Sequence, residues 1–135
     1  MAVQLSDAVR NARLDTIETT VGTAPILRIR TGAQPANCAA ARTGTVLASP
    51  TLPSDWMAAA ASGAKAKSGT WQDTSADAAG TAAHFEIMDS SLTTCHMQGT
   101  VTATGGGGDM TVDNVVFAVG QQFTVTGFTL TDGNA

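Results

Sequence analysis

The chain has 135 residues and a formal net charge of −4, and only 13% of its residues are charged, about half the usual fraction. This length predicts one domain with its own hydrophobic core. The seven Lys and Arg residues are scattered along the sequence, which argues against nucleic-acid binding because phosphate recognition needs clustered cations.

The first residues contain neither the basic segment nor the apolar run of a signal peptide. No stretch approaches the roughly 20 apolar residues of a membrane span. We therefore expect synthesis in a cytoplasm and no association with a membrane. In such a reducing compartment Cys38 and Cys95 are expected to be free thiols, with a disulfide between them as the alternative.

One amphipathic helix is predicted over residues 6–20. Ser6 is a favourable N-cap, Asp7 suits the positive end of the helix dipole, and Gly22 is placed to end the helix. Apolar residues form two offset stripes along this segment, Leu5, Val9 and Ala12 on one and Leu14, Ile17 and Val21 on the other.

The rest of the chain has the alternation and turn residues of short β-strands. Expected strands cover residues 26–31, 44–49, 65–74, 82–88, 94–102, 109–113, 115–118 and 121–131. In the first of these, Arg28 and Arg30 share one face. In the last, Phe123 and Val125 alternate with threonines, and Gly127 breaks the phase as a β-bulge would. The alternation in 82–88 places His84, Glu86 and Met88 outward, on a polar face that is either solvated or part of an interface.

These elements predict a mainly β fold, a single β-sandwich of jelly-roll type with one N-terminal helix. The expected organisation is an N-terminal helix or arm over residues 1–22 and a β-sandwich domain over residues 23–135.

Few residues in the sequence suggest chemistry. His84 and His96 are expected opposite each other on the arms of one hairpin, but a metal site needs a third ligand, and none is evident. Cys95 is expected on the core face with Met97 and Val101. The glycines at 105–108 lack the Lys-Ser/Thr ending of a phosphate-binding loop, so they are expected to bend or to lie flat against a neighbour. We therefore expect no enzyme activity, no cofactor and no metal.

Several segments resemble small structural proteins of tailed bacteriophages and prophages. They are residues 1–15, 27–32, 44–48, 76–85, 89–101 and 119–126. This resemblance implies a capsid cement or decoration protein in the virion, made in the cytoplasm of a bacterial host. Such a protein binds the major capsid protein on the outside of the head and stabilises it. It would act as a homo-oligomer, a dimer or a trimer.

Two other functions remain open at this point. One is a structural subunit of the tail, the neck or a fibre attachment. The other is a carbohydrate-binding adhesion module, which the low aromatic content of 4% disfavours. The residues expected at an interface lie on the helix, the first strand, the predicted hairpin and one tryptophan: Val9, Leu14, Ile17, Arg28, Arg30, Trp56, His84, Glu86, His96 and Gln98.

Overall fold

Local capping signals define the helix, α1 (Asp7–Val21), in the computed structural model, which describes residues 3–133. The Ser6 hydroxyl accepts a hydrogen bond from the Val9 amide, and the Gly22 amide donates to Glu18 at the other end. Gly22 has a φ of 93°, a conformation that glycine adopts without steric cost. The predicted helix is therefore confirmed. None of the described helical residues forms a segment long and apolar enough to cross a membrane.

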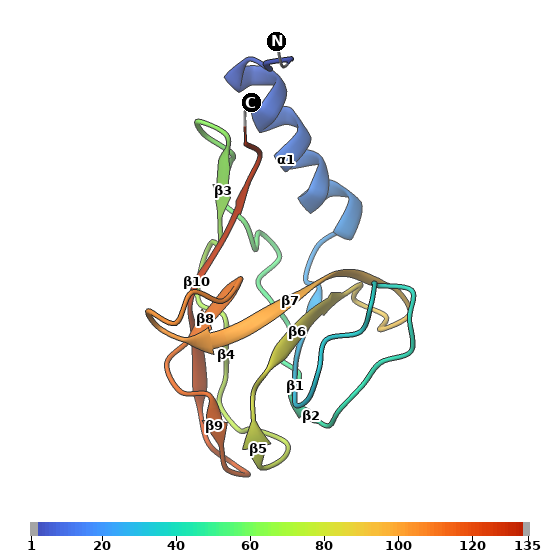
Figure 1. The fold of residues 1–135 in the computed structure, drawn as a ribbon, viewed down its shortest axis with the longest axis vertical. Helices are drawn as coiled ribbons and strands as arrows, with labels where there is room; N and C mark the ends of the chain where they lie inside the picture. The colour runs from blue at the N-terminus through green and yellow to red at the C-terminus, as the bar shows by residue number, and fades with distance from the viewer. Residues whose placement is uncertain (1–2, 134–135) are drawn as a thin grey trace.

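The remaining elements are strands, so the fold is mainly β with one N-terminal helix (Figure 1). In chain order they are β1 (Ile26–Arg30), β2 (Val46–Ala48), β3 (Ala64–Ala66), β4 (Gln72–Asp73), β5 (Gly80–Thr81), β6 (His84–Met88), β7 (Cys95–Ala103), β8 (Met110–Val112), β9 (Val116–Phe117) and β10 (Phe123–Thr131). The predicted strand 65–74 is divided into β3 and β4, and β5 was not anticipated.

A large mixed sheet has the strand order β2-β1-β6-β7-β8-β10-β3, and β4 also pairs with β10. Strands β5 and β9 form a separate two-stranded sheet. As the sequence predicted, the register of β10 against β8 shifts between Val125 and Gly127. This bulge keeps both Phe123 and Phe128 buried, because it restores the apolar alternation after the phase break.

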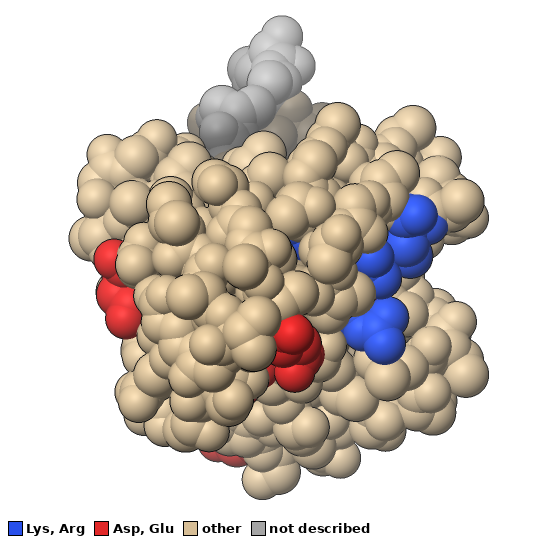
Figure 2. All heavy atoms as spheres, turned by 90° about the horizontal axis from the view of Figure 1, so that it is seen from below, with Lys and Arg blue, Asp and Glu red and all other residues tan. Residues whose placement is uncertain are grey.

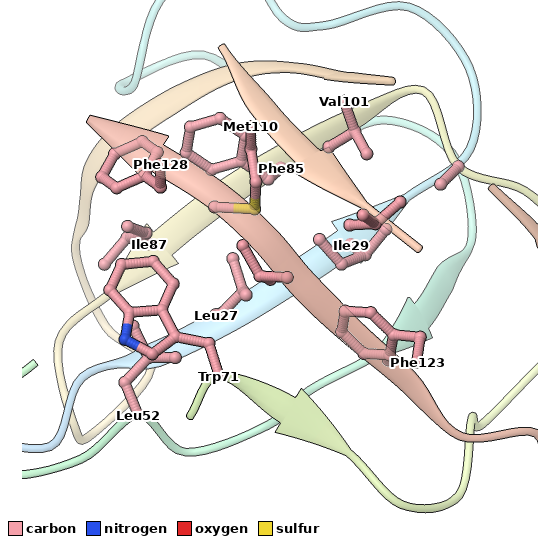
Figure 3. Packing of buried hydrophobic residues seen from close by; sticks show 14 of the residues in the cluster. Leu27, Ile29, Leu52, Trp71, Phe85, Ile87, Val101, Met110, Phe123 and Phe128 are labelled. Atoms are coloured by element: carbon pink, nitrogen blue, oxygen red, sulfur yellow. The ribbon is translucent and has the colours of Figure 1, made fainter. Parts of the chain in front are cut away.

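The core lies where β10 crosses over β1 and β6, with apolar side chains from the three strands between them (Figure 3). Aromatic rings form a continuous path through it, with Trp56 next to Trp71, Trp71 next to Phe128, and Phe128 edge-on to Phe85. Centroid separations of 5.4–5.9 Å are typical of favourable aromatic pairs. Both tryptophans are fully buried in this cluster.

The glycine run explains an unusual connection between β7 and β8. These strands are parallel, with Val101 opposite Met110, although parallel neighbours are usually joined by a crossover of about a dozen residues or more. Here only residues 104–109 are available, and they fold back over Thr102. A Cβ at Gly106 or Gly108 would lie 2.7 Å or 2.9 Å from atoms of the Thr102 side chain. The glycines thus allow the close contact of this loop with its own strand.

Candidate functional site

A buried carboxylate is at the centre of the polar face that the sequence marked for an interface. Glu86 lies in β6 between Phe85 and Ile87, which point into the core, so its own side chain points to the opposite face. It is 0% exposed. Arg30 Nε donates to Glu86 Oε1 at 2.9 Å, Arg42 donates to Oε2 at 3.1 Å, and an Arg28 nitrogen lies 4.0 Å from Oε1.

The loop of residues 32–45 covers this carboxylate. Arg42 extends from the loop and also donates to the Gln98 side-chain oxygen at 3.1 Å, while the Gln98 amide donates to the Pro35 carbonyl at 2.8 Å. The second guanidinium nitrogen of Arg42 donates to loop carbonyls at Asn37, Cys38 and Ala40. The expected outward exposure of His84 and Glu86 is therefore wrong, because both side chains are buried and the protein's own loop covers this face of β6.

The two histidines do not face each other, contrary to the sequence-based expectation. His84 pairs across the hairpin with Thr100 and its Nδ1 lies 3.0 Å from the Gly32 carbonyl, so its neighbours belong to the loop. His96 lies at the other end of the hairpin, beside the helix. Among residues 3–133, no three His, Cys, Asp or Glu side chains gather in an arrangement that could hold a metal ion.

A bulge near the start of β7 also overturns the placement of Cys95. Ile87 pairs with Met97, but Met88 pairs with Cys95, so the register shifts by one residue. Cys95 is thereby turned to the outer face, where Arg42 approaches its Sγ at 3.4 Å. A single extra residue reverses the face of every position beyond it.

The helix residues named for an interface are divided between surface and interior. Val9 is exposed, Leu14 is buried, and Ile17 is half-buried and packs on the core. Ile17 and His96 line one shallow depression of about 210 Å³, together with Thr16, Thr20 and Val21. The structure thus brings one helix position and one hairpin position together, at the C-terminal end of α1.

Trp56, the remaining interface candidate, lies in the core. Its indole Nε1 donates to the Gly22 carbonyl at 3.0 Å. That carbonyl follows the last turn of α1, so the hydrogen bond fastens the helix end to the β domain.

A second buried charge, Lys65, was missed by the sequence analysis. It is 2% exposed, and its Nζ donates to Asp15 Oδ1 at 2.7 Å and to the Ala58 carbonyl at 2.8 Å, with Glu18 Oε2 at 2.9 Å. Burial alone would lower the pKa of Lys65, but hydrogen bonds to Asp15 and Glu18 raise it above its usual value. The sequence did contain one signal for this site: Asp15 and Glu18 are three residues apart and so lie on one face of the helix, where they can bind one cation together.

Asp15 and Glu18 also line a larger open pocket of about 530 Å³, with hydroxyls from Thr19, Thr23 and Ser54. The same Lys65 contact lowers the pKa of Asp15, with a further contribution from the Ala60 amide. Both carboxylates already form ion pairs with Lys65. They therefore hold α1 against β3, and their charge is largely compensated within the protein.

Comparisons with protein-family models, with curated proteins and with solved structures find no match to this chain.

Proposed function

We propose that this chain is a virion structural protein, a capsid cement or decoration protein that binds the major capsid protein on the outside of a phage head. The proposal starts from the resemblance of several of its segments to phage structural proteins. One structural observation carries it further: the basic side chains are used within the molecule, which leaves a weakly charged surface.

Each Lys and Arg of the chain has an intramolecular partner. Arg10 pairs with Asp7 and Arg13 with Asp132, three arginines surround Glu86, Lys65 binds two helix carboxylates, and Lys67 donates to the Gly69 carbonyl. The face seen in Figure 2 is mostly uncharged, with separated acidic side chains and one group of basic ones. Such a surface suits close packing against other proteins better than binding to nucleic-acid phosphates.

The exposed side of α1 is the proposed contact surface. The helix lies at one end of the long axis of the molecule, beside β3 and the C-terminal part of β10 (Figure 1). Val9 is 46% exposed on this helix. The depression formed by Ile17 and His96 lies at its C-terminal end. An apolar side chain of a capsid subunit that entered this depression would be removed from water, and this burial would favour binding.

Stabilisation would follow from mass action. A protein that binds only the assembled, expanded shell shifts the equilibrium toward that shell by its binding free energy. Repetition over the lattice, in dimers or trimers on local symmetry axes, adds the multivalent contribution.

The same proposal includes the finer fold assignment, a β-sandwich of jelly-roll type. The crossing of β10 over β1 and β6 with a core between them supports it (Figure 3). The parallel pairing of β7 with β8 is a departure from the all-antiparallel arrangement of such folds.

The test is to mix the purified protein with bare, expanded heads of its phage and to image them by electron cryo-microscopy. We expect density that repeats over the head lattice. Heads that stay bare, or density confined to the neck or tail, would refute the capsid assignment. Binding to a glycan array in place of heads would instead support the adhesion module.

Two matched variants test the contact surface. Val9→Asp places a charge on α1, whereas Val119→Asp places one on a valine that is 71% exposed near β9, at the opposite end of the molecule. Val9→Asp should lower the occupancy of heads at least tenfold, and Val119→Asp should leave it unchanged. Equal occupancy for the two variants would show that α1 does not contact the shell.

A further inference from the structure

The two cysteines of the chain lie next to each other in the fold. Cys38 belongs to the loop 32–45 and Cys95 to the first position of β7. The Cys38 side chain is near enough to the Cys95 thiol to contribute to the raised pKa of that thiol. Both are free thiols that are partly accessible to solvent.

Arg42 holds this pair in place. One of its nitrogens donates to the Cys38 carbonyl at 3.0 Å, and another donates to Cys95 Sγ at 3.4 Å. The same guanidinium is anchored by buried Glu86. A single side chain therefore fixes both the backbone of Cys38 and the sulfur of Cys95.

This arrangement favours disulfide formation. A disulfide needs two cysteines that are close in space, with side chains directed at each other, and one guanidinium group contacts both the Cys38 carbonyl and Cys95 Sγ here. The β7 bulge is what turns Cys95 toward the loop. Without it, Cys95 would point into the core and away from Cys38.

We propose that Cys38 and Cys95 form a redox-sensitive pair that closes into an intramolecular disulfide when the folded protein meets a low-molecular-weight disulfide such as oxidised glutathione. The inference is independent of the proposed virion role. A protein that leaves a reducing cytoplasm would meet such conditions.

The reaction proceeds by two thiol–disulfide exchanges. Burial, followed by the contact with Cys38, raises the pKa of the Cys95 thiol to about 11, so Cys95 stays protonated at neutral pH. In the first exchange Cys38 loses its proton to solvent and attacks oxidised glutathione, which forms a mixed disulfide and releases one glutathione thiolate. Cys95 then loses its proton to solvent and attacks the Cys38 sulfur, which displaces the second glutathione thiolate. The two cysteine sulfurs are oxidised and one oxidised glutathione is reduced to two thiols.

The disulfide would hold the loop 32–45 covalently over Glu86 until it is reduced. In the reduced protein this cover depends on hydrogen bonds, those of Arg42 and Gln98 together with those of Arg30 and His84 to loop carbonyls. The oxidised protein should therefore unfold at a higher temperature than the reduced one, and the difference should disappear on reduction.

The experiment incubates the reduced full-length protein with oxidised glutathione, with and without denaturing urea, then blocks remaining thiols with a maleimide and measures the intact mass. In the native buffer we expect a monomer that has lost two hydrogens and carries neither maleimide nor glutathione. In urea, where Arg42 no longer positions the pair, ring closure should be at least tenfold slower.

Single substitutions complete the test. Cys38→Ser and Cys95→Ser should each end with one glutathione attached or one maleimide, and their unfolding temperatures should not rise on oxidation. Two free thiols in the oxidised native protein would overturn the proposal. A disulfide-linked dimer as the main product, or equal closure rates with and without urea, would overturn it as well.

Discussion

Replacing Glu86 by glutamine should destabilise the protein strongly, although the two side chains have nearly the same shape. Glu86 is the shared anion for Arg30 and Arg42, with Arg28 close by. Glu86→Gln removes the negative charge and puts an amide NH₂ where one of the arginines donates. The three cations then lack a counter-charge, and one donor at least lacks an acceptor.

The size of the effect follows from the burial of the network. Removing one partner of a buried ion pair costs about 3–5 kcal/mol, because the remaining charge stays desolvated. The arginine side chains here retain 9%, 18% and 25% exposure for Arg30, Arg42 and Arg28. Water can therefore partly replace the lost carboxylate, and we expect the lower end, about 3 kcal/mol.

Urea unfolding followed by tryptophan fluorescence measures this change, since Trp56 and Trp71 are both buried. With a slope of about 1–3 kcal/mol per molar urea, the midpoint should fall by about 1–3 M. The loss should persist at high salt, because buried pairs are screened weakly. Asp77→Asn is the matched control, since Asp77 is exposed. A free energy of unfolding for Glu86→Gln within about 0.5 kcal/mol of Asp77→Asn would refute the reasoning.

Three further predictions concern stability. Hydrogen bonds from the Thr93 hydroxyl and amide, and then from the Thr94 amide and the Ser91 hydroxyl, lower the pKa of Asp89 from 3.8 to about 2. The ionised Asp89 carboxylate therefore stabilises the folded protein above about pH 4, and this stabilisation is lost as the pH falls through the folded-state pKa of about 2. Between about pH 4 and 2 the unfolding temperature of Asp89→Asn should therefore fall less than that of the wild type; equal slopes would contradict this. Gly106→Ala should cost about 1–3 kcal/mol in urea unfolding, because the new Cβ meets Thr102 at 2.7 Å, whereas Gly133→Ala has open space and should be neutral. Trp56→Phe should cost about 2 kcal/mol in the same assay, because it leaves the Gly22 carbonyl without its 3.0 Å donor and opens a gap in the core; a loss below about 0.5 kcal/mol would show that the hydrogen bond adds nothing.

The elements that the sequence predicts well are those specified by neighbouring residues. Ser6 and Gly22 mark the helix ends through contacts within one turn. Phe123, Val125 and Phe128 reveal both the alternation of β10 and its bulge, because the glycine lies at the phase break itself. Such signals need no knowledge of the rest of the fold.

The candidate site was harder to predict, because its composition depends on a loop without periodicity. Alternation in residues 82–88 separates Phe85 and Ile87 from His84 and Glu86, and the structure confirms that separation. It cannot reveal that Arg42, far away in the sequence, covers Glu86. Lys65 shows the same limit, since a lysine among alanines resembles a surface residue until Asp15 and Glu18 are placed beside it.

The bulge in β7 determines whether Cys95 faces the core or the loop 32–45. Regular alternation would put Cys95 with Met97 in the core, where a thiol is inert and distant from the loop. The shift between Ile87 and Met88 instead places Cys95 beside Arg42 and Cys38. No turn residue or glycine marks this position, so the side of the strand on which Cys95 lies follows from the register alone.

Because the arginines of β1 pair with Glu86 inside the protein, they are not free to bind a partner. Arg28 and Arg30 were expected at an interface with a partner, but both already lie next to the Glu86 carboxylate. Freeing either one would leave Glu86 partly uncompensated in a buried position, at a cost that an exposed ion pair of about 0–1 kcal/mol cannot offset. The proposed contact with a capsid subunit therefore does not use Arg28 or Arg30, and it relies on exposed apolar side chains such as Val9.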